Sequence, residues 1–558
     1  MAELFLQNYN NPKLQIHNLL NTKRMQGIKE NQERLIPIIE SIIFLGRQNI
    51  PFRGHRDDGQ LDLPSTIEDG GSSINEGHFR ELLKFRVKVG DSTLENHLKI
   101  SSSKATYISK TIQNELIELC GKEILDSILN KITDTVIFYS IVFDETLDVS
   151  KRSQISLVIR YIDEITIRED FVTFVDAFDE ARLIQLKSYY NKLSDDEEVN
   201  NDSTLDNYES CKKIEKISIT GKMLGQIVLN QLREMGLNLN KCVGIGTDGC
   251  SVMTSEVCGA VAVIIKSSPN ARRCPCYNHS LNISISKSNK VQSLRNLVGI
   301  IKEVVGFFSV SAKRTVVLKK YIGHQLTGLC ETRWIERHEG VTRFLQDMPK
   351  TINTLTEITT WKDSQTSGKA KILSCAFAQF HILSDQNFPE KNLDLSTAAN
   401  TIKDTLQVLS KCRENVDTEF SNIFKLSEDL AKIIDVELRL PRIFGEYYIW
   451  KEKWIRDYQK DSSVISKHAI EVLQNCDEDI FPLINKILKL LITLPISNSS
   501  SERTFSSLRR LKTWLRSTMC ETRLTGLALL NIHRDIDIDV EKLIERFSKS
   551  KRKIPFAI

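Results

Sequence analysis

The sequence predicts an α/β protein in which a mixed β-sheet core is interrupted by a large all-α insertion and preceded by an N-terminal helical region. Three observations support this class. Apolar residues recur at helical spacing through the first part of the chain, three β-rich runs follow in succession, and most of 285–490 returns to a helical pattern. A chain of 558 residues exceeds the size of one core, so several domains or a core with an insertion are expected.

The N-terminal helical region is predicted over residues 1–132. An apolar stripe over about 24–48 predicts an amphipathic helix, and Pro51 ends it. A stretch rich in Asp, Gly and Ser then predicts a loop before a second helix near 78–87. More helix is expected over 91–132.

Three β-rich runs with short charged interruptions predict an antiparallel meander. They span 135–143, 154–162 and 165–174. The acidic segment from Ser194 to Ser203, which has no aromatic residue, follows, and we interpret it as part of a loop insertion near 178–214.

A helix and a fourth strand complete the predicted sheet core. Apolar residues from Leu224 to Met235 follow helical spacing, Gly236 occupies the C-cap position, and a short strand ends near Gly246. Three strands, a helix, a strand and then helices is the order of an RNase H-like core. The predicted domains after the N-terminal region are an RNase H-like core, a helical insertion, C-terminal core helices and a basic tail, at 133–335, 336–490, 491–540 and 541–558.

Three distant acidic residues are the candidate catalytic groups. Asp144 ends the first predicted strand, Asp248 follows the fourth, and Glu502 opens an amphipathic helix. In this strand order the two aspartates lie at one edge of the sheet, where the glutamate can join them around divalent metal for two-metal phosphoryl transfer. Each residue also has an ordinary explanation. Asp144 and Asp248 suit turns, and Ser499-Ser-Ser-Glu502 matches a capping box.

Other motifs are ambiguous on residue type alone. Cys276 and His279 are one helical turn apart, which suits either part of a zinc site or a packed Cys with a His aimed at phosphate. Arg333 beside Trp334 suits either a phosphate clamp with a base-stacking ring or a core Trp. The cationic stretch that starts at Arg503 suits either DNA binding or a solvated face on a core or dimer helix.

Five of these motifs in this order resemble the landmark series of hAT-superfamily DNA transposases. They are Phe143-Asp144-Glu-Thr, Thr247-Asp248-Gly, Cys276-x-x-His279, Thr332-Arg333-Trp334 and Ser501-Glu502-Arg503-Thr-Phe. The resemblance covers about 130–535. The segment from Phe44 to His55 is similar to the leading segment of a branch that includes zinc-finger MYM-type proteins.

The resemblance implies a carboxylate triad of Asp144, Asp248 and Glu502 that holds two Mg²⁺ (or Mn²⁺) ions for cut-and-paste DNA transposition. It implies that Arg333 and Trp334 hold the distorted DNA strand and that Cys276 and His279 lie near the active site. It also implies a homodimer or higher oligomer formed through the C-terminal region. Active members usually carry an N-terminal zinc-binding module, and no Cys precedes Cys120, so we expect a truncated copy or a host-recruited derivative.

Composition and charge limit where the protein acts and how it can bind DNA. The net charge is only +4, so any grip on DNA must come from local patches. We expect no membrane span, and the scattered cysteines suit a reducing compartment. The basic residues Lys549 to Lys553 suit either a nuclear address or a solvated chain end. The two functional hypotheses are a transposase-like nuclear DNA-processing enzyme and a non-catalytic dimeric nuclear protein that binds nucleic acid or protein partners on the same fold.

Overall fold

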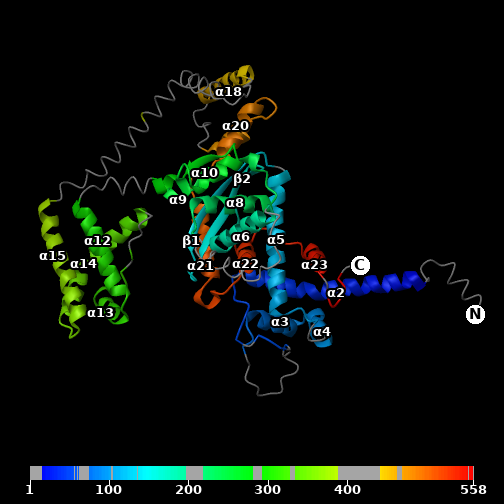
Figure 1. Ribbon diagram of the computed structural model, residues 1–558, viewed down its shortest axis with the longest axis horizontal. Helices are drawn as coiled ribbons and strands as arrows, with labels where there is room; N and C mark the ends of the chain where they lie inside the picture. The colour runs from blue at the N-terminus through cyan, green and yellow to red at the C-terminus, as the bar shows by residue number, and fades with distance from the viewer. Residues whose placement is uncertain are drawn as a thin grey trace, which may run out of the picture. The chain divides into compact units, whose positions relative to one another are not determined.

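The protein forms two compact units in a computed structural model (Figure 1). The structure describes residues 16–55, 57–59, 61, 75–101, 105–134, 136–195, 218–280, 292–326, 328, 334–387, 407, 440–460, 468–550 and 552–556. Unit 1 contains Met1–Pro275 and Trp454–Ile558, and unit 2 contains Cys276–Lys453. Each has its own hydrophobic core. None of the helices in the described part is long and apolar enough to span a membrane.

The N-terminal part of unit 1 is helical, as the apolar spacing predicts. Its helices are α2 (Ile16–Arg47), α3 (His78–Val89), α4 (Ser92–Ile100) and α5 (Lys110–Asp134). The stripe of α2 that includes Leu35, Ile38 and Ile42 is fully buried in the core. A hydrophobic face of this width is what packing against neighbouring helices requires.

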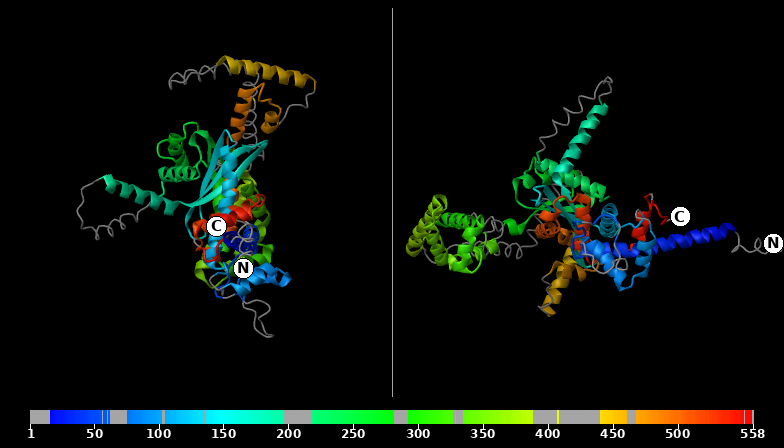
Figure 2. Two further views of the ribbon diagram at one scale, coloured as in Figure 1. Left: turned by 90° about the vertical axis from the view of Figure 1, so that its right-hand side faces the viewer. Right: turned by 90° about the horizontal axis from the view of Figure 1, so that it is seen from below.

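A five-stranded mixed sheet forms the centre of unit 1. The strands are β1 (Tyr139–Leu147), β2 (Ser153–Asp163), β3 (Thr166–Asp176), β4 (Cys242–Thr247) and β5 (Arg272–Pro275). Their order is β3-β2-β1-β4-β5. The pairs β1–β2 and β2–β3 are antiparallel, whereas β4 is parallel to both β1 and β5. Figure 2 shows β2 and β3 as long neighbouring strands. The antiparallel pairs form the predicted meander, and β4 adds the predicted fourth strand in parallel to β1.

The connection from β3 to β4 differs from the prediction at its start. The segment predicted as a loop near 178–214 begins as helix α6 (Ala177–Asp195). The Asp176 carboxylate accepts hydrogen bonds from the backbone N–H groups of Phe178 and Asp179, and acidic residues in the first turn favour the positive end of the helix dipole. The rest of the predicted loop, 196–217, lies outside the described residues.

Four helices flank β4 in the sequence. They are α8 (Gly221–Glu234), η3 (Leu239–Lys241), α9 (Ser251–Thr254) and α10 (Ala260–Ser267). The predicted end of α8 is confirmed. Gly236 has φ 71°, and the N–H of Leu237 donates to the carbonyl of Leu232 at 3.0 Å, as in a Schellman motif.

The C-terminal helices complete the core of unit 1. They are α19 (Ala469–Gln474), α20 (Pro482–Thr493), α21 (Ser499–Leu511), η5 (Trp514–Arg516), α22 (Glu521–Ile532) and α23 (Val540–Ser548). Helix α22 crosses α5 closely, because a Cβ on Gly121 would lie 2.7 Å from the Cα of Gly526. The apolar side chains of α22 are therefore buried within the chain rather than offered to a partner.

The segment predicted as a basic tail, 541–558, is packed. Leu543, Ile544 and Phe547 of α23 are buried, because they form one apolar face at helical spacing. The Arg552 guanidinium lies 3.5 Å from the Phe547 ring centroid and pairs with Glu115. The apolar face of α23 is therefore packed, whereas Lys549 and Lys553 are exposed, and the interpretation of 549–553 as a solvated chain end stays a prediction.

Unit 2 is helical where it is described. Its helices are α12 (Gln292–Ser309), α13 (Ala312–Ile322), α14 (Trp334–Thr359) and α15 (Ser364–Asn387), and α18 (Leu440–Lys460) spans its end. The first two helices bury apolar side chains, such as Val304 and Leu318, in one core with α14 and α15. The units divide at Pro275 rather than at the predicted residue 335, because these two helices share the core of unit 2.

Candidate active site

The strand register brings Asp144 and Asp248 to neighbouring positions. Val142 of β1 is paired with Gly246 of β4 in the parallel ladder. Two residues further along each strand, the same register leads to Asp144 and Asp248. Side chains two residues apart point to the same face, so the two carboxylates lie on one face at the end of this strand pair.

Helix α21 lies over the same face and carries Glu502. Asp144 is the cross-strand partner of Ser156, so their side chains share a face. The Ser156 hydroxyl is 2.6 Å from the Thr504 hydroxyl of α21. The Ser501 hydroxyl also donates to the Val142 carbonyl at 3.3 Å. These two contacts flank Glu502 in the helix and fix its first turns over β1 and β2.

The chain before α21 passes close to β4, and this approach requires glycine. A Cβ added to Gly246 would lie 3.1 Å from side-chain atoms of Pro495, and one added to Gly244 would lie 2.7 Å from the same proline. The glycines of the Val243-Gly-Ile-Gly-Thr247 strand therefore leave room for the segment that leads into α21. That segment positions Glu502 near the end of β4.

The three acids interact electrostatically. Burial, and then the neighbouring carboxylate of Asp248, raise the pKa of Asp144 to about 7. Glu502 also raises this pKa, whereas the backbone N–H of Glu145, which donates to Asp144 Oδ1 at 2.9 Å, lowers it. A carboxyl that is partly buried among like charges gives up its proton reluctantly. Asp144 therefore lies within electrostatic range of both Asp248 and Glu502.

The ordinary explanations of these acids have different outcomes. Asp144 does not end a strand, because β1 continues to Leu147. Asp248 does form a turn, and its Oδ1 accepts the N–H of Cys250 at 3.2 Å. The N-cap of α21 is Asn498, so the third helical position, where a capping box needs its glutamate, is Ser501 rather than Glu502.

The side chains do not form a closed metal cage. Among the residues that the structure describes, no group of three His, Cys, Asp or Glu side chains is arranged to hold a metal ion. The charges of Asp248 and Glu502 act on Asp144, but the three side chains do not have the short spacing of a ligand set. The acids gather at one place, and the two-metal geometry itself stays a prediction.

A polar network that the sequence gave no reason to select anchors the start of α21. Arg160 of β2 donates to the carbonyl of Ile492 at 2.8 Å and pairs with Glu169 of β3. The Ser500 hydroxyl donates to Glu169, and Arg503 donates to that hydroxyl at 2.7 Å. The network joins two strands to the helix that carries Glu502. Only the run of serines before Glu502 offered a signal, and that run also suits a simple helix cap.

The remaining predicted site residues belong to unit 2. Cys276 is buried, and its carbonyl accepts the N–H of Ser280 in a helical turn that includes the half-buried His279. Arg333 lies outside the described residues. Trp334 begins α14, and its side chain is not described. The roles predicted for these four residues stay predictions.

Two family models match the chain. Residues 1–195 match a family described as the ZMYM1/FAM200 RNase-like domain. Residues 454–536 match the C-terminal dimerisation region of the hAT family. The first match includes β1 to β3 with Asp144, and the second includes α21 with Glu502. The two matched segments therefore meet at the candidate site.

Curated relatives support the same assignment. The chain is 22% identical to the 52 kDa repressor of the inhibitor of the protein kinase of Homo sapiens, over 94% of this chain and 78% of that protein. It is equally similar to the Mus musculus protein of the same name, with 22% identity and the same coverage. Residues 1–195 are thus similar to an RNase-like domain, residues 454–536 are similar to the hAT C-terminal dimerisation region, and the mixed five-stranded sheet is compatible with the first of these matches.

Proposed function

We propose that this chain is a transposase-derived protein that cleaves and joins DNA with Mg²⁺ or Mn²⁺ held by Asp144, Asp248 and Glu502. The observation that carries the proposal is the convergence of three sequence-distant acids. The parallel pairing of Val142 with Gly246 supports neighbouring positions for Asp144 and Asp248, and the pKa of Asp144 is raised by burial and then by the charges of Asp248 and Glu502.

The donor set fits a hard divalent cation. Carboxylate oxygens are the ligands that Mg²⁺ prefers, and Mg²⁺ takes the rest of its shell from water and substrate phosphate. Burial and mutual repulsion of the acids give this site a deficit of positive charge, which a divalent ion offsets. Bound there, metal ions supply an activated water or 3′ hydroxyl and stabilise the leaving oxygen. The anchored first turns of α21 keep Glu502 in range of the two aspartates.

Other residues have proposed roles in holding DNA. The Arg503 side chain is 75% exposed beside Glu502, where it can meet a phosphate. Arg333, Trp334, His279 and Cys276 are assigned to the DNA strand by their match to the family motifs alone. Because the proposed substrate is DNA, we expect the protein to act in the nucleus. We also expect it to form a homodimer or higher oligomer through its C-terminal region.

Cleavage of branched or nicked DNA by the purified full chain tests the proposal. We expect cleavage in Mg²⁺ or Mn²⁺ and a loss of at least about 100-fold in Asp144→Asn and Asp248→Asn, because each removes a charge on which the metal and the transition state depend. Asp163→Asn is the matched control, since Asp163 at the end of β2 pairs with Lys131 of α5 and is not in the candidate site. Wild-type protein that cleaves no DNA with either ion would overturn the catalytic role.

A second candidate function is a non-catalytic dimer that binds nucleic acid or protein partners on the same fold. Two observations favour it. The described acids are not arranged as a metal-holding group, and the two relatives are named as repressors. This alternative predicts that wild type and Asp144→Asn bind DNA or partner equally and that neither cleaves DNA, which gel-shift and cleavage assays on the same samples distinguish.

A further inference from the structure

A second group of acidic side chains lines a cavity elsewhere in unit 1. The cavity has a volume of about 690 Å³. The turn between β1 and β2, the junction of β3 and α6, and the connection from α21 to α22 form its walls. Its polar lining includes Arg152, Gln154, Asp176, Asp179, Lys512 and Glu521. Its size is in the range of ligand sites, about 300–1,000 Å³.

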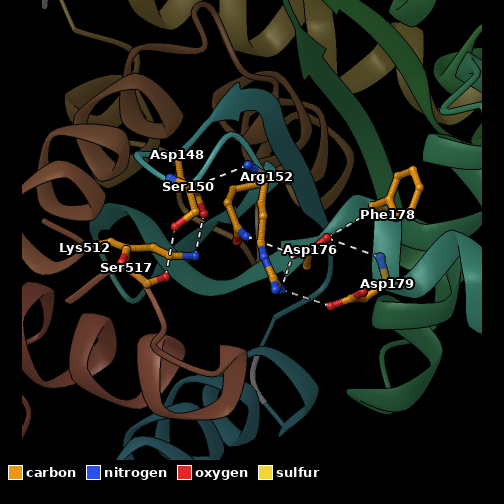
Figure 3. Close-up of polar contacts among 9 residues, drawn as sticks. Asp148, Ser150, Arg152, Asp176, Phe178, Asp179, Lys512 and Ser517 are labelled. Carbon is orange, nitrogen blue, oxygen red and sulfur yellow. Dashed lines mark hydrogen bonds and ion pairs between the residues drawn. The ribbon is translucent and has the colours of Figure 1, made fainter. Parts of the chain in front are cut away.

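The cationic side chains of the wall are paired. Lys512 forms an ion pair with Asp148 in which both side chains are almost completely buried, at 3% and 1% exposure. Arg152 lies 3.3 Å from carboxylate oxygens of both Asp176 and Asp179. Figure 3 shows these polar contacts. The positive charges of Lys512 and Arg152 are thus neutralised by carboxylates of the same chain. The cavity is therefore poorly suited to bind phosphate.

Gln154 leaves a buried acceptor without a partner. The residue is 2% exposed, and its Nε2 faces Asp176 Oδ2 at 3.5 Å. An ionised carboxylate only accepts hydrogen bonds, so the amide nitrogen must face it and the amide oxygen must face away. The Oε1 atom has no hydrogen-bond partner among the described residues. A buried acceptor in this state destabilises the protein until a donor reaches it.

Glu521 is a second group at the cavity whose charge a cation would stabilise. It lies in the first turn of α22 and lines the same cavity. Burial raises its pKa to about 7, and the nearby acids Asp176, Glu180 and Asp179 act in the same direction, whereas a backbone hydrogen bond from Asp176 opposes them. A cationic hydrogen-bond donor would satisfy both this carboxylate and Gln154 Oε1.

The position of the cavity indicates where such a donor comes from. Lys512 to Leu524 lie within the segment that matches the hAT dimerisation region, 454–536. Trp514, which lines the cavity, is 80% exposed, and Leu515 beside it is 98% exposed. Two large apolar side chains held out in this way suit coverage by a partner. The apolar side chains of α22 are buried, whereas the connection before it is an exposed part of this region that a second copy can contact.

We propose that the cavity receives a basic side chain, arginine or lysine, from a second copy of this chain. Gln154 Oε1 and Glu521 accept its N–H groups, and Trp514 covers its aliphatic carbons. In a two-fold dimer the same contact occurs twice. The proposal rests on self-association through the C-terminal region and is independent of DNA cleavage, so an inactive protein that dimerises leaves it intact.

Sedimentation velocity of the full chain tests the contact. We expect the dimer dissociation constant to rise at least about tenfold in Gln154→Leu and in Glu521→Gln, because charged-group hydrogen bonds contribute about 1.5–3 kcal/mol each. The matched control is Glu541→Gln, an exposed acid in the first turn of α23. Free methylguanidinium should weaken the wild-type dimer in the same way. An unchanged constant in both cavity variants overturns the proposal, as does a wild type that stays monomeric.

A wild-type measurement guards against variants that fail to fold. Cys520 is exposed and lines the cavity, whereas Cys258 is exposed away from it. Alkylation followed by mass spectrometry should show Cys520 protected as protein concentration passes the dimerisation range, with Cys258 reacting at a constant rate. Dimerisation without protection of Cys520 contradicts the assignment. Protection that requires added DNA or another protein also contradicts it, because the occupant would then not be a second copy.

Discussion

Two acidic groups of unit 1 differ in how their negative charge is compensated. The candidate active site sets Asp144 beside Asp248, with Glu502 in range, and the pKa of Asp144 rises to about 7. Around the cavity, Asp148 and Asp176 instead have Lys512 and Arg152 as internal partners. An internal cation neutralises a buried carboxylate and stabilises the fold. Carboxylates that repel one another are instead stabilised by binding a cation from outside the chain. The difference separates the paired acids Asp148 and Asp176 from Asp144, and Glu521 at the cavity, whose pKa is also raised to about 7 by burial, resembles Asp144.

The largest expected effect is on stability and concerns the buried ion pair between Lys512 and Asp148. Lys512→Met should lower the free energy of unfolding by about 3–5 kcal/mol, because it leaves Asp148 buried without its cation. Urea unfolding of the full chain measures this. Lys131→Met, which breaks the exposed pair with Asp163, should cost no more than about 1 kcal/mol. Equal losses in the two variants would erase the distinction between the paired cavity acids and surface pairs.

The next effect concerns the candidate active site. Saturating Mg²⁺ or Mn²⁺ should raise the unfolding midpoint of the wild type, since a ligand at 100 times its dissociation constant stabilises by about 2.7 kcal/mol. Asp144→Asn and Asp248→Asn should lose most of this shift, and Asp179→Asn at the cavity should keep it. Thermal unfolding with and without metal is the measurement. A shift that survives both site variants would place the metal elsewhere.

The strand register explains why the neighbouring positions of Asp144 and Asp248 could be predicted from the sequence and the cavity could not. Asp144 and Asp248 each follow a recognisable apolar run, so strand order alone brings them together. Gln154, Asp176 and Glu521 belong to segments whose approach depends on how α22 packs against α5 and β3. No local pattern encodes that packing. The buried end of the chain shows the same limit, because basic residues around Arg552 concealed the apolar face of α23.

The helical secondary structure was readable for a similar reason. The stripe of α2 and the Gly236 stop signal of α8 are local, and both were predicted correctly. The start of α6 was missed because its acidic residues, which favour a helix N-terminus, also suit a solvated loop. The division at Pro275 depends on the core that α12 and α13 share with later helices, which is a property of tertiary packing.

A smaller effect follows from the pH dependence of the metal-free protein. The folded-state pKa of Asp144 is about 7, above its ordinary value near 3.9, so folding binds a proton between these values. The stability associated with Asp144 is therefore intact below about pH 4 and is lost as pH rises towards 7 and above. Asp144→Asn should raise the free energy of unfolding on the order of 2 kcal/mol at pH 8 and change it little at pH 4. Chelated samples unfolded in urea at both pH values measure this. A variant less stable than wild type at pH 8 would show that the acids do not repel one another.

The smallest effect concerns the exposed cation of the cavity. The Arg152 side chain is 57% exposed, so its pairs with Asp176 and Asp179 are screened by water. Asp176 also keeps two backbone donors, the N–H groups of Phe178 and Asp179, when the guanidinium is removed. Arg152→Ala should therefore lower the free energy of unfolding by less than about 1 kcal/mol. Because it removes positive charge from the wall, it should also strengthen the attraction of the cavity for a basic side chain. Urea unfolding and sedimentation of one sample distinguish the two effects, and a weaker dimer would mean that Arg152 contacts the partner directly.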